Sequence, residues 1–327
     1  TQPSAVKDIE VRVLDVQRNV EKIVEGKEIA HSFNVVGLKE GEYVYVTNEA
    51  GETEKVGPAN ASGTITFPPE GRDVAGTFTV TIAGLTWEDI LLDKHDQTLT
   101  YKDMYLDYNS TDGKDPIPNS AEGNKTTVTY SVTSSNPSVS VNSSSGDITV
   151  LSTGTTTALA QAEASSVYNV GNATSTITVG DLSVGTIAPR TYNGEEQKLT
   201  ESDIPVLFNK ASVAAENYKI IGYENNINAT TADSKAKVTI ELMNNYVGTI
   251  TAEFDIMPLE VTPIWSQEST FTYNGQAQSP TGSIPAGQLI SGDSCEIDIT
   301  YTDDQGRAVA NNKDAGKYIA IASTTTN

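Results

Sequence analysis

Apolar and polar residues alternate over many short stretches of this chain, and turn-forming residues separate the stretches. Alternation with a period of two, rich in Val, Ile, Thr and Tyr, is typical of β-strands that bury one face. Clusters of Gly, Asn, Asp, Ser and Pro favour tight turns between such strands. Strands this short and this frequent predict an all-β fold of small sandwich domains. The pattern predicts strands at residues 9–16, 43–47, 76–81, 126–132, 138–141, 174–179, 235–242, 248–256, 296–300 and 317–322.

Helical patterns are rare in this sequence. Residues 87–93 (WEDILLD) and 210–216 (KASVAAE) each suit one or two helical turns. No stretch approaches 18 consecutive apolar residues, so we expect no membrane insertion in this fragment. No signal peptide or sorting signal is visible, and the chain starts at Thr1 without Met. We therefore expect a piece of a longer protein.

The phrase Thr-Tyr-Asn-Gly-x-x-Gln occurs twice, at residues 191–197 and 272–278. Its tyrosines, Tyr192 and Tyr273, are 81 residues apart, a spacing that fits two copies of one small domain. The Asn-Gly pair predicts a tight turn near the first strand, and the Tyr ring is expected to anchor that strand on the core. Because aromatic rings also stack on sugar faces, Tyr192 and Tyr273 are the two candidate ligand-binding residues.

Further repeats divide the chain into four modules, at about 1–85, 86–180, 181–259 and 260–327. The segment NNYVGTITAEFDI of the third module has the pattern of a closing strand. The fourth module has no equivalent of it, so we expect that module to be truncated or to lack its last strand. The second module shows a different order, in which four strands alternate with Ser-Asn-Pro, Ser-Gly-Asp and Gly-Thr turns.

These stretches resemble repeat modules of bacterial surface proteins. "YSVTSSNPSVSVNSSSGDITVLSTGTTT" and "YNVGNATSTITV" resemble a bacterial Ig-like group 2 domain. "TYNG", "NNYVGTITAEFDI" and "DAGKYIAIA" resemble MBG-type modules, to which the first module is a more distant match through "VAGTFTVTIAGL". The resemblance implies an elongated tandem array of small Ig-like β-sandwiches on a secreted or surface-attached bacterial protein. For the Tyr-Asn-Gly modules a β-grasp-like fold is the alternative.

The composition excludes several classes of binding partner and indicates where the protein is located. The net charge of −22 repels nucleic-acid backbones and anionic membrane surfaces, so neither is expected as a partner. Cys295 is the single cysteine, which excludes an intrachain disulfide. The low lysine and arginine content and the abundance of Thr, Ser, Asn and Gly favour an extracellular bacterial location. Acidic residues and prolines near sheet edges oppose strand pairing between chains, so we expect a monomer.

Candidate catalytic chemistry is sparse. The two histidines, His31 and His95, fall in different modules, lack the spacing of metal ligands and do not accompany Cys295. No nucleophile-elbow, dinucleotide-binding or phosphate-loop motif is present, so we expect no enzyme and no organic cofactor. Calcium is the candidate metal, because the stretch DYNSTDGKD loosely resembles a calcium loop, although it lacks an acidic residue at the twelfth position. Its oxygen ligands are Asp107, Asn109, Asp112 and Asp115.

Three functions remain open from the sequence. The modules bind a host glycan or extracellular-matrix protein in adhesion, or they form a semi-rigid stalk that spaces other domains. The third is an accessory role in a secreted carbohydrate-active enzyme. A lysine-to-Asn or Asp cross-link is a further hypothesis, with Lys237 as the candidate by position, although lysine is rarely buried and we expect this one to face water.

Overall fold

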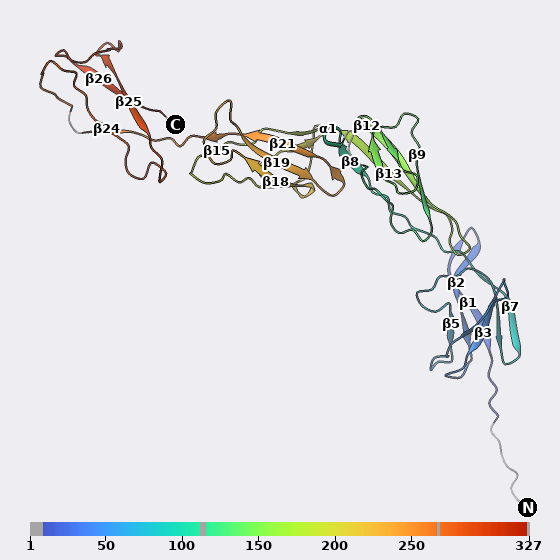
Figure 1. Ribbon diagram of the computed structural model, residues 1–327. Helices are drawn as coiled ribbons and strands as arrows, with labels where there is room; N and C mark the ends of the chain where they lie inside the picture. Colours follow the sequence, from blue (N-terminus) through green and yellow to red (C-terminus); the bar gives the residue numbers. More distant parts are fainter. Residues whose placement is uncertain (1–8, 112–115, 267–268, 326–327) are drawn as a thin grey trace, which may run out of the picture. The chain divides into compact units, whose positions relative to one another are not determined.

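The computed structural model describes residues 9–111, 116–266 and 269–325. Almost all of the regular structure is β-strand, which confirms the prediction of an all-β fold built from tandem modules (Figure 1). The chain forms two compact units, Thr1–Tyr105 with Asp112–Val179, and Leu106–Thr111 with Gly180–Asn327. No helix within the described residues is long and apolar enough to cross a membrane.

The first module, in the first unit, is a sandwich of two antiparallel sheets (Figure 1). One sheet has the strand order β1-β2-β5 and the other has the order β4-β3-β6-β7. The strands are β1 (Asp15–Val24), β2 (Lys27–Val36), β3 (Val44–Asn48), β4 (Thr53–Val56), β5 (Ile65–Phe67), β6 (Gly76–Ile82) and β7 (Leu85–Leu92).

Three aromatic rings hold the two sheets together. Phe67 stacks on Phe33 within one sheet and meets Phe78 of the other sheet edge-on, with 5.1 Å between ring centroids in both pairs. Along β6, Phe78, Val80 and Ile82 are buried while the residues between them are not. Burying a side chain of this kind contributes about 1.5–3 kcal/mol, so the alternation seen in the sequence directly produces the core.

The prediction of a helix at residues 87–93 is wrong, because these residues form β7 against β6. A register shift opposite Phe78 and Val80, with Asp89 at a φ of 57°, interrupts the period of two in this strand. The bulge disguises the alternation as a helical pattern. Because β7 belongs to the first sandwich, that module extends to Leu92 and not to residue 85.

The strand predicted at residues 9–16 is largely wrong as well. Regular pairing starts at Asp15, and Ile9, Val11 and Val13 are more than 80% exposed. Residues 9–14 therefore have the alternating pattern of a strand, but they pair with no strand that the structure describes.

The second module is built around the antiparallel strands β9, β12 and β13, with β12 in the middle. Strands β10 and β11 form a hairpin, which confirms the expected Ser-Gly-Asp turn. In that turn the Asn142 side-chain oxygen accepts the N–H groups of Ser144 and Ser145, at 2.9 and 3.1 Å. The elements are β8 (Met104–Asp107), α1 (Tyr108–Thr111), β9 (Val128–Val132), β10 (Val139–Val141), β11 (Ile148–Val150), β12 (Gly154–Ala162) and β13 (Gly171–Gly180).

The third module, in the second unit, has the sheets β14-β16-β17, β15-β22 and β18-β19-β21. Its residues 180–259 contain no α-helix, so the helix that a β-grasp fold places across its sheet is missing. The helix predicted at 210–216 is wrong, since a short strand and a 3-10 turn occupy this stretch. The elements are β14 (Leu182–Val184), β15 (Arg190–Thr191), η1 (Glu201–Asp203), β16 (Val206–Phe208), β17 (Ala211–Ser212), η2 (Ala215–Asn217), β18 (Tyr218–Glu224), β19 (Ala236–Leu242), β20 (Tyr246–Val247), β21 (Thr249–Phe254) and β22 (Ile256–Met257).

The expected closing strand of the third module is confirmed. β21 runs antiparallel to β19, and the chain then continues into β22, which pairs in parallel with β15. One segment thereby joins the main sheet to the strand that carries the Tyr-Asn-Gly phrase. Phe254 and Ile256 on this segment are buried in the core.

The fourth module contains β23 (Ile264–Trp265), β24 (Gly282–Ser283), β25 (Glu296–Asp303) and β26 (Tyr318–Thr325). β25 and β26 form a two-stranded antiparallel sheet, and β23 pairs with β24. Among residues 257–324, no residue that the structure describes is buried. The fourth module therefore presents apolar side chains without the closed core of the other three.

Candidate functional site

Both copies of the Tyr-Asn-Gly phrase form the expected tight turn. Gly194 and Gly275 have φ angles of +81° and +75°, a region in which a side chain is strained. The Asn193 side-chain oxygen accepts the N–H of Glu195 at 3.0 Å, and the Asn274 side-chain oxygen accepts the N–H of Gln276 at 2.9 Å. The repeated Asn-Gly is thus explained by local backbone chemistry.

The two tyrosines of the phrase have different surroundings. Tyr192 is half-buried, its N–H donates to the Met257 carbonyl at 2.9 Å, and its hydroxyl donates to Asp293 at 3.1 Å. That hydrogen bond raises the pKa of Tyr192. Tyr273 is 64% exposed, so the expectation that it anchors a strand on a core is wrong. The structure does not bring the two candidate residues into one site.

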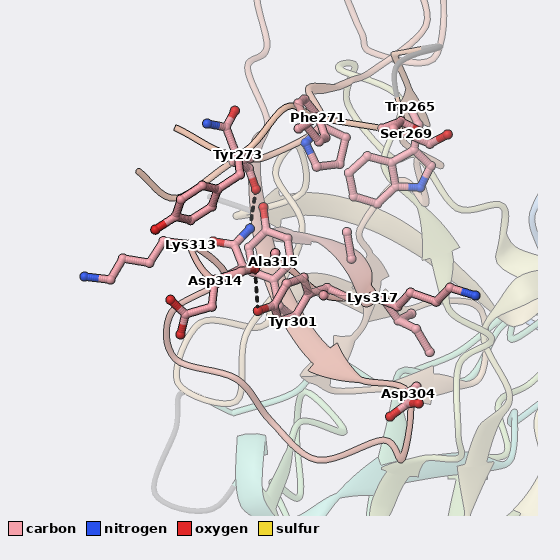
Figure 2. A pocket seen from close by; sticks show the side chains of 18 of the residues that line it. Trp265, Ser269, Phe271, Tyr273, Tyr301, Asp304, Lys313, Asp314, Ala315 and Lys317 are labelled. Atoms are coloured by element: carbon pink, nitrogen blue, oxygen red, sulfur yellow. Dashed lines mark hydrogen bonds between the residues drawn. The ribbon is translucent and has the colours of Figure 1, made fainter. Parts of the chain in front are cut away.

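Tyr273 lies instead on the rim of a groove in the fourth module, which we call the β26 groove (Figure 2). Its volume is about 950 Å³. One wall comes from the stretch that carries the Tyr-Asn-Gly phrase and the opposite wall from β26 and the loop before it. Five aromatic side chains line the groove: Trp265, Phe271, Tyr273, Tyr301 and Tyr318.

Three of the polar side chains that line the β26 groove form hydrogen bonds within the module. Tyr318 donates its hydroxyl to the Asp314 carbonyl at 3.0 Å, Tyr301 bonds the Ser279 hydroxyl, and Asn312 donates to the Gln278 carbonyl. Charged side chains such as Lys313 extend away from the rings (Figure 2). The groove therefore combines aromatic rings with charged side chains, those of Asp304, Lys313, Asp314 and Lys317.

The expected calcium loop has a structural role at its first residue. Asp107 is 2% exposed, and its two carboxylate oxygens accept the N–H groups of Ser110 at 2.9 Å and Leu182 at 3.1 Å. The candidate ligand Asn109 is exposed on α1. Asp112 and Asp115 lie outside the described residues. Within the described part of the chain, no group of three His, Cys, Asp or Glu side chains is placed to hold a metal ion.

The cross-link candidate Lys237 faces outward, as expected. Its neighbours on β19, Ala236 and Val238, are fully buried, whereas Lys237 is half-buried on the opposite face. In the sheet it stands between Glu224 of β18 and Glu253 of β21. A lysine flanked by two glutamates on a solvent-facing surface is an ordinary cross-strand charge arrangement.

The two histidines meet where the first module joins the second, a contact that no sequence pattern predicted. The rings of His31 and His95 stack with 4.2 Å between centroids and 21° between planes. Each also has a polar partner across the joint: His31 Nε2 lies 3.3 Å from the Lys94 carbonyl, and His95 Nε2 lies 3.2 Å from the Val74 carbonyl. The two rings pack against each other at the joint, and among the residues that the structure describes they belong to no group of three possible metal ligands.

Two further contacts cross the same joint. The Tyr168 hydroxyl donates to Asp73 at 2.5 Å, a hydrogen bond that lowers the pKa of Asp73 and raises the pKa of Tyr168. Lys22 and Asp96 form an exposed ion pair at 3.2 Å. These contacts link side chains of the first sandwich to two segments of the second module.

Asp93 fixes the point where the chain leaves the first module. Its side chain is 7% exposed and accepts the Ala30 N–H at 3.0 Å, Lys27 at 2.7 Å and Arg18 at 3.3 Å. Burial opposes ionisation of this carboxyl, but the hydrogen bonds from Lys27 and Ala30 outweigh it and lower the pKa of Asp93. The backbone N–H of Asp93 also donates to the Ala30 carbonyl, at 2.8 Å.

No protein-family model matches this sequence, and no curated protein matches it. Among solved structures, the chain is similar to the I9–I11 tandem of titin, with 11% identity, 69% of this chain and 92% of that chain covered, and a TM-score of 0.21. It is similar to a C-terminal fragment of intimin bound to the intimin-binding domain of Tir, with 14% identity, 56% of this chain and 69% of that chain covered, and a TM-score of 0.25. It is also similar to Drosophila N-cadherin EC1–4, with 10% identity, 88% of this chain and 89% of that chain covered, and a TM-score of 0.23. TM-scores this low carry no argument, so the fold and the site rest on the structure itself.

Proposed function

We propose that this chain is a non-enzymatic, extracellular stalk region in which the first two β-modules are held at a fixed joint. The observation that carries the proposal is the joint between the first two modules. The Asp93 N–H bonds to Ala30 in the first sandwich, and the His95 N–H bonds to Val167 in the second module, at 2.8 and 2.9 Å. A single residue, Lys94, separates the two anchored positions, so the joint has almost no free linker.

Side-chain contacts support the same role. A linker of one residue leaves few backbone angles free, and the stacked His31 and His95 rings together with the Tyr168–Asp73 bond restrain those angles further. A flexible tether would instead show a longer run rich in Gly, Ser or Pro. The closed cores of the first three modules and the strong acidity suit a structural segment that stays soluble. The bacterial surface location remains part of the proposal through the sequence resemblance alone.

The joint is tested by comparing residues 1–327 with two variants in small-angle X-ray scattering. The first variant inserts Gly-Ser-Gly-Ser after Lys94 and frees the joint. The second inserts the same residues after Ala50, in the exposed β3–β4 turn, as a matched control. We expect the joint insertion to broaden the distribution of radii of gyration and the control to leave it unchanged. Equal distributions for wild type and joint variant would contradict a fixed joint.

Adhesion is the second candidate, and the aromatic lining of the β26 groove favours it. In this case the fourth module binds a host glycan or a matrix protein. Binding of residues 1–327 to a glycan and matrix-protein array, compared with Tyr273→Ala and with Tyr192→Ala outside the groove, tests it. A saturable ligand lost only in Tyr273→Ala would support adhesion, and an array without saturable binding would contradict it.

A further inference from the structure

Each Tyr-Asn-Gly phrase contains an asparagine that is followed directly by glycine. In such a pair the backbone nitrogen of the glycine can attack the carbonyl carbon of the asparagine side chain, because no Cβ on the second residue hinders the approach. The sequence contains two Asn-Gly pairs, at residues 193–194 and 274–275, and Tyr precedes both. The local sequence is therefore matched, so a difference in reactivity between the two pairs depends on their surroundings.

In the third module the asparagine side chain is bonded to a buried partner. The Asn193 side-chain oxygen accepts the side-chain amide of Gln197 at 2.5 Å, in addition to the N–H of Glu195. Gln197 is 8% exposed, its N–H donates to the Asn226 carbonyl at 2.7 Å, and its carbonyl accepts the Asn226 side-chain amide at 3.1 Å. Rotation of the Asn193 amide toward the backbone therefore breaks a hydrogen bond to a residue that the module holds in place.

The glycine of the third module lies in a crowded position. A Cβ built on Gly194 would lie 2.6 Å from the Cγ2 atom of Ile290. The residue before the pair is held as well, since the Tyr192 N–H bonds to the Met257 carbonyl at 2.9 Å and the Tyr192 hydroxyl bonds to Asp293 at 3.1 Å. These contacts fix the turn and oppose the backbone movement that attack on the side chain requires.

The turn of the fourth module is open to solvent. Residues 272–277 are all exposed and belong to no strand. A Cβ built on Gly275 would meet no atom beyond its chain neighbours within 4 Å. The Asn274 side-chain oxygen bonds to the Gln276 N–H inside the turn itself, and Gln278, which ends the phrase, is half-buried where its counterpart in the third module is buried. The Asn274 amide is therefore less restrained than the amide in the third module.

We propose that Asn274 and Gly275 form a self-modifying site, which deamidates without an enzyme, whereas Asn193 is protected. The Gly275 backbone nitrogen attacks the Asn274 Cγ atom and forms a five-membered succinimide ring, a step favoured because both groups belong to one chain. The Cγ–Nδ2 bond breaks, and the amide leaves as ammonia with the proton from the Gly275 nitrogen. Water then opens the ring at either carbonyl and gives an aspartyl or an isoaspartyl linkage. Water is the only co-reactant, and nothing is oxidised or reduced.

The reaction changes the fourth module next to a candidate ligand-binding residue. Tyr273, on the rim of the β26 groove, directly precedes the modified residue in the chain. The new carboxylate adds a negative charge beside this ring, and the isoaspartyl form lengthens the backbone path of the turn by one carbon atom. Conversion therefore alters the rim of the groove over time, while the third module keeps its amide. The reaction does not depend on the joint between the first two modules, so the stalk proposal stands or falls separately.

The test follows both asparagines in residues 1–327 during incubation at mildly alkaline pH and physiological temperature. Peptide mass spectrometry measures the replacement of the side-chain amide by a carboxylate, and chromatography separates the aspartyl and isoaspartyl peptides. We expect Asn274 to convert about 10-fold or more faster than Asn193 in the folded chain, since Asn193 reacts only after its turn opens. In urea, where both turns are unfolded, we expect the two rates to agree within about twofold, because Tyr and Gly flank both asparagines.

Two variants test the cause of the difference. Gly275→Ala places a Cβ beside the attacking nitrogen and is expected to slow conversion of Asn274 by about 10-fold, with Asn193 as the internal reference. Gln197→Ala removes the bond to the Asn193 side chain and is expected to speed conversion of Asn193 by about fivefold while the rate at Asn274 stays unchanged. Amide exchange in β19 verifies that the third module of this variant remains folded.

The proposal is overturned by equal rates for the two asparagines in the folded chain, or by a difference that persists in urea, which would assign it to sequence and not to structure. It is also overturned if Asn274 stays intact in the folded chain over the time in which the urea-unfolded chain converts.

Discussion

Asp93 offers the sharpest test of how the first module is held together at the joint. The perturbation is Asp93→Ala, which removes a nearly buried carboxylate and leaves the fully buried Ala30 N–H without an acceptor. Asp93→Asn is the milder variant, since its amide oxygen retains that acceptor but loses the charge. Glu10→Gln is the control, because Glu10 makes an exposed ion pair with Lys39 at 3.0 Å.

The magnitude follows from the partners of Asp93. A hydrogen bond from a buried N–H to a charged group contributes about 2 kcal/mol. The ion pairs with Lys27 and Arg18 are partly exposed and together add about 1 kcal/mol. We therefore expect Asp93→Ala to lower the free energy of unfolding by about 3 kcal/mol and Asp93→Asn by about 1 kcal/mol. Glu10→Gln is expected to stay within about 0.5 kcal/mol of wild type.

The assay is urea unfolding followed by fluorescence of Trp87, which packs against the core of the first module. A Trp265→Phe background removes the other tryptophan. With an m-value of about 1.5 kcal/mol per M, the Asp93→Ala midpoint falls by about 2 M. A midpoint equal to that of Glu10→Gln would refute the assignment of Asp93 as the anchor of this module.

The lowered pKa of Asp93 adds a pH dependence to the same assay. A carboxyl whose pKa is lower in the folded state stabilises that state above the pKa of the unfolded carboxyl, and this contribution is lost as the pH falls through the folded value. Wild type should therefore lose more stability than Asp93→Asn between neutral pH and strongly acidic pH. Parallel pH profiles of the two proteins would contradict this reasoning.

Three further predictions concern the other modules and one backbone turn. Gly63→Ala should cost at least about 2 kcal/mol in the Trp87 assay, because Gly63 has a φ of +71° and a Cβ would lie 2.2 Å from the Leu38 carbonyl oxygen; Gly26→Ala, in open space, should cost about half as much. Ile240→Ala should lower the stability of the third module by about 3 kcal/mol, measured as faster amide exchange in β19, and an unchanged rate would show that the site collapses around the smaller side chain. Asp107→Asn should destabilise the second unit by about 1–2 kcal/mol, while millimolar calcium leaves the thermal midpoint of wild type unchanged; a calcium-dependent rise would restore the metal hypothesis.

The sequence predicted most strands because alternation reports directly on which face is buried. β6 and β19 illustrate this, since their inward residues are the apolar ones in the pattern. β7 was not predicted as a strand, because the bulge at Asp89 shifts the phase of the alternation. The stretch at 9–16 shows the converse error, in which alternation exists without a partner strand.

The site was harder to predict because its features arise from contacts between distant residues. The stacking of His31 on His95 joins positions 64 residues apart, and no local pattern marks them as neighbours. The repeated phrase did predict its Asn-Gly turns, which depend on adjacent residues only. It did not predict the different surroundings of Tyr192 and Tyr273, because these depend on whether a closing strand lies beside the phrase.

The most direct test of the stalk proposal is the distance distribution between spin labels on the first two modules, measured by pulsed electron–electron double resonance. Labels at Glu70→Cys and Thr174→Cys, both exposed positions, in a Cys295→Ser background place one probe on each side of the joint. The proposal predicts a single narrow distribution that broadens when Gly-Ser-Gly-Ser is inserted after Lys94. A broad distribution in the uninterrupted chain would contradict a fixed joint and, with it, the role as a semi-rigid stalk.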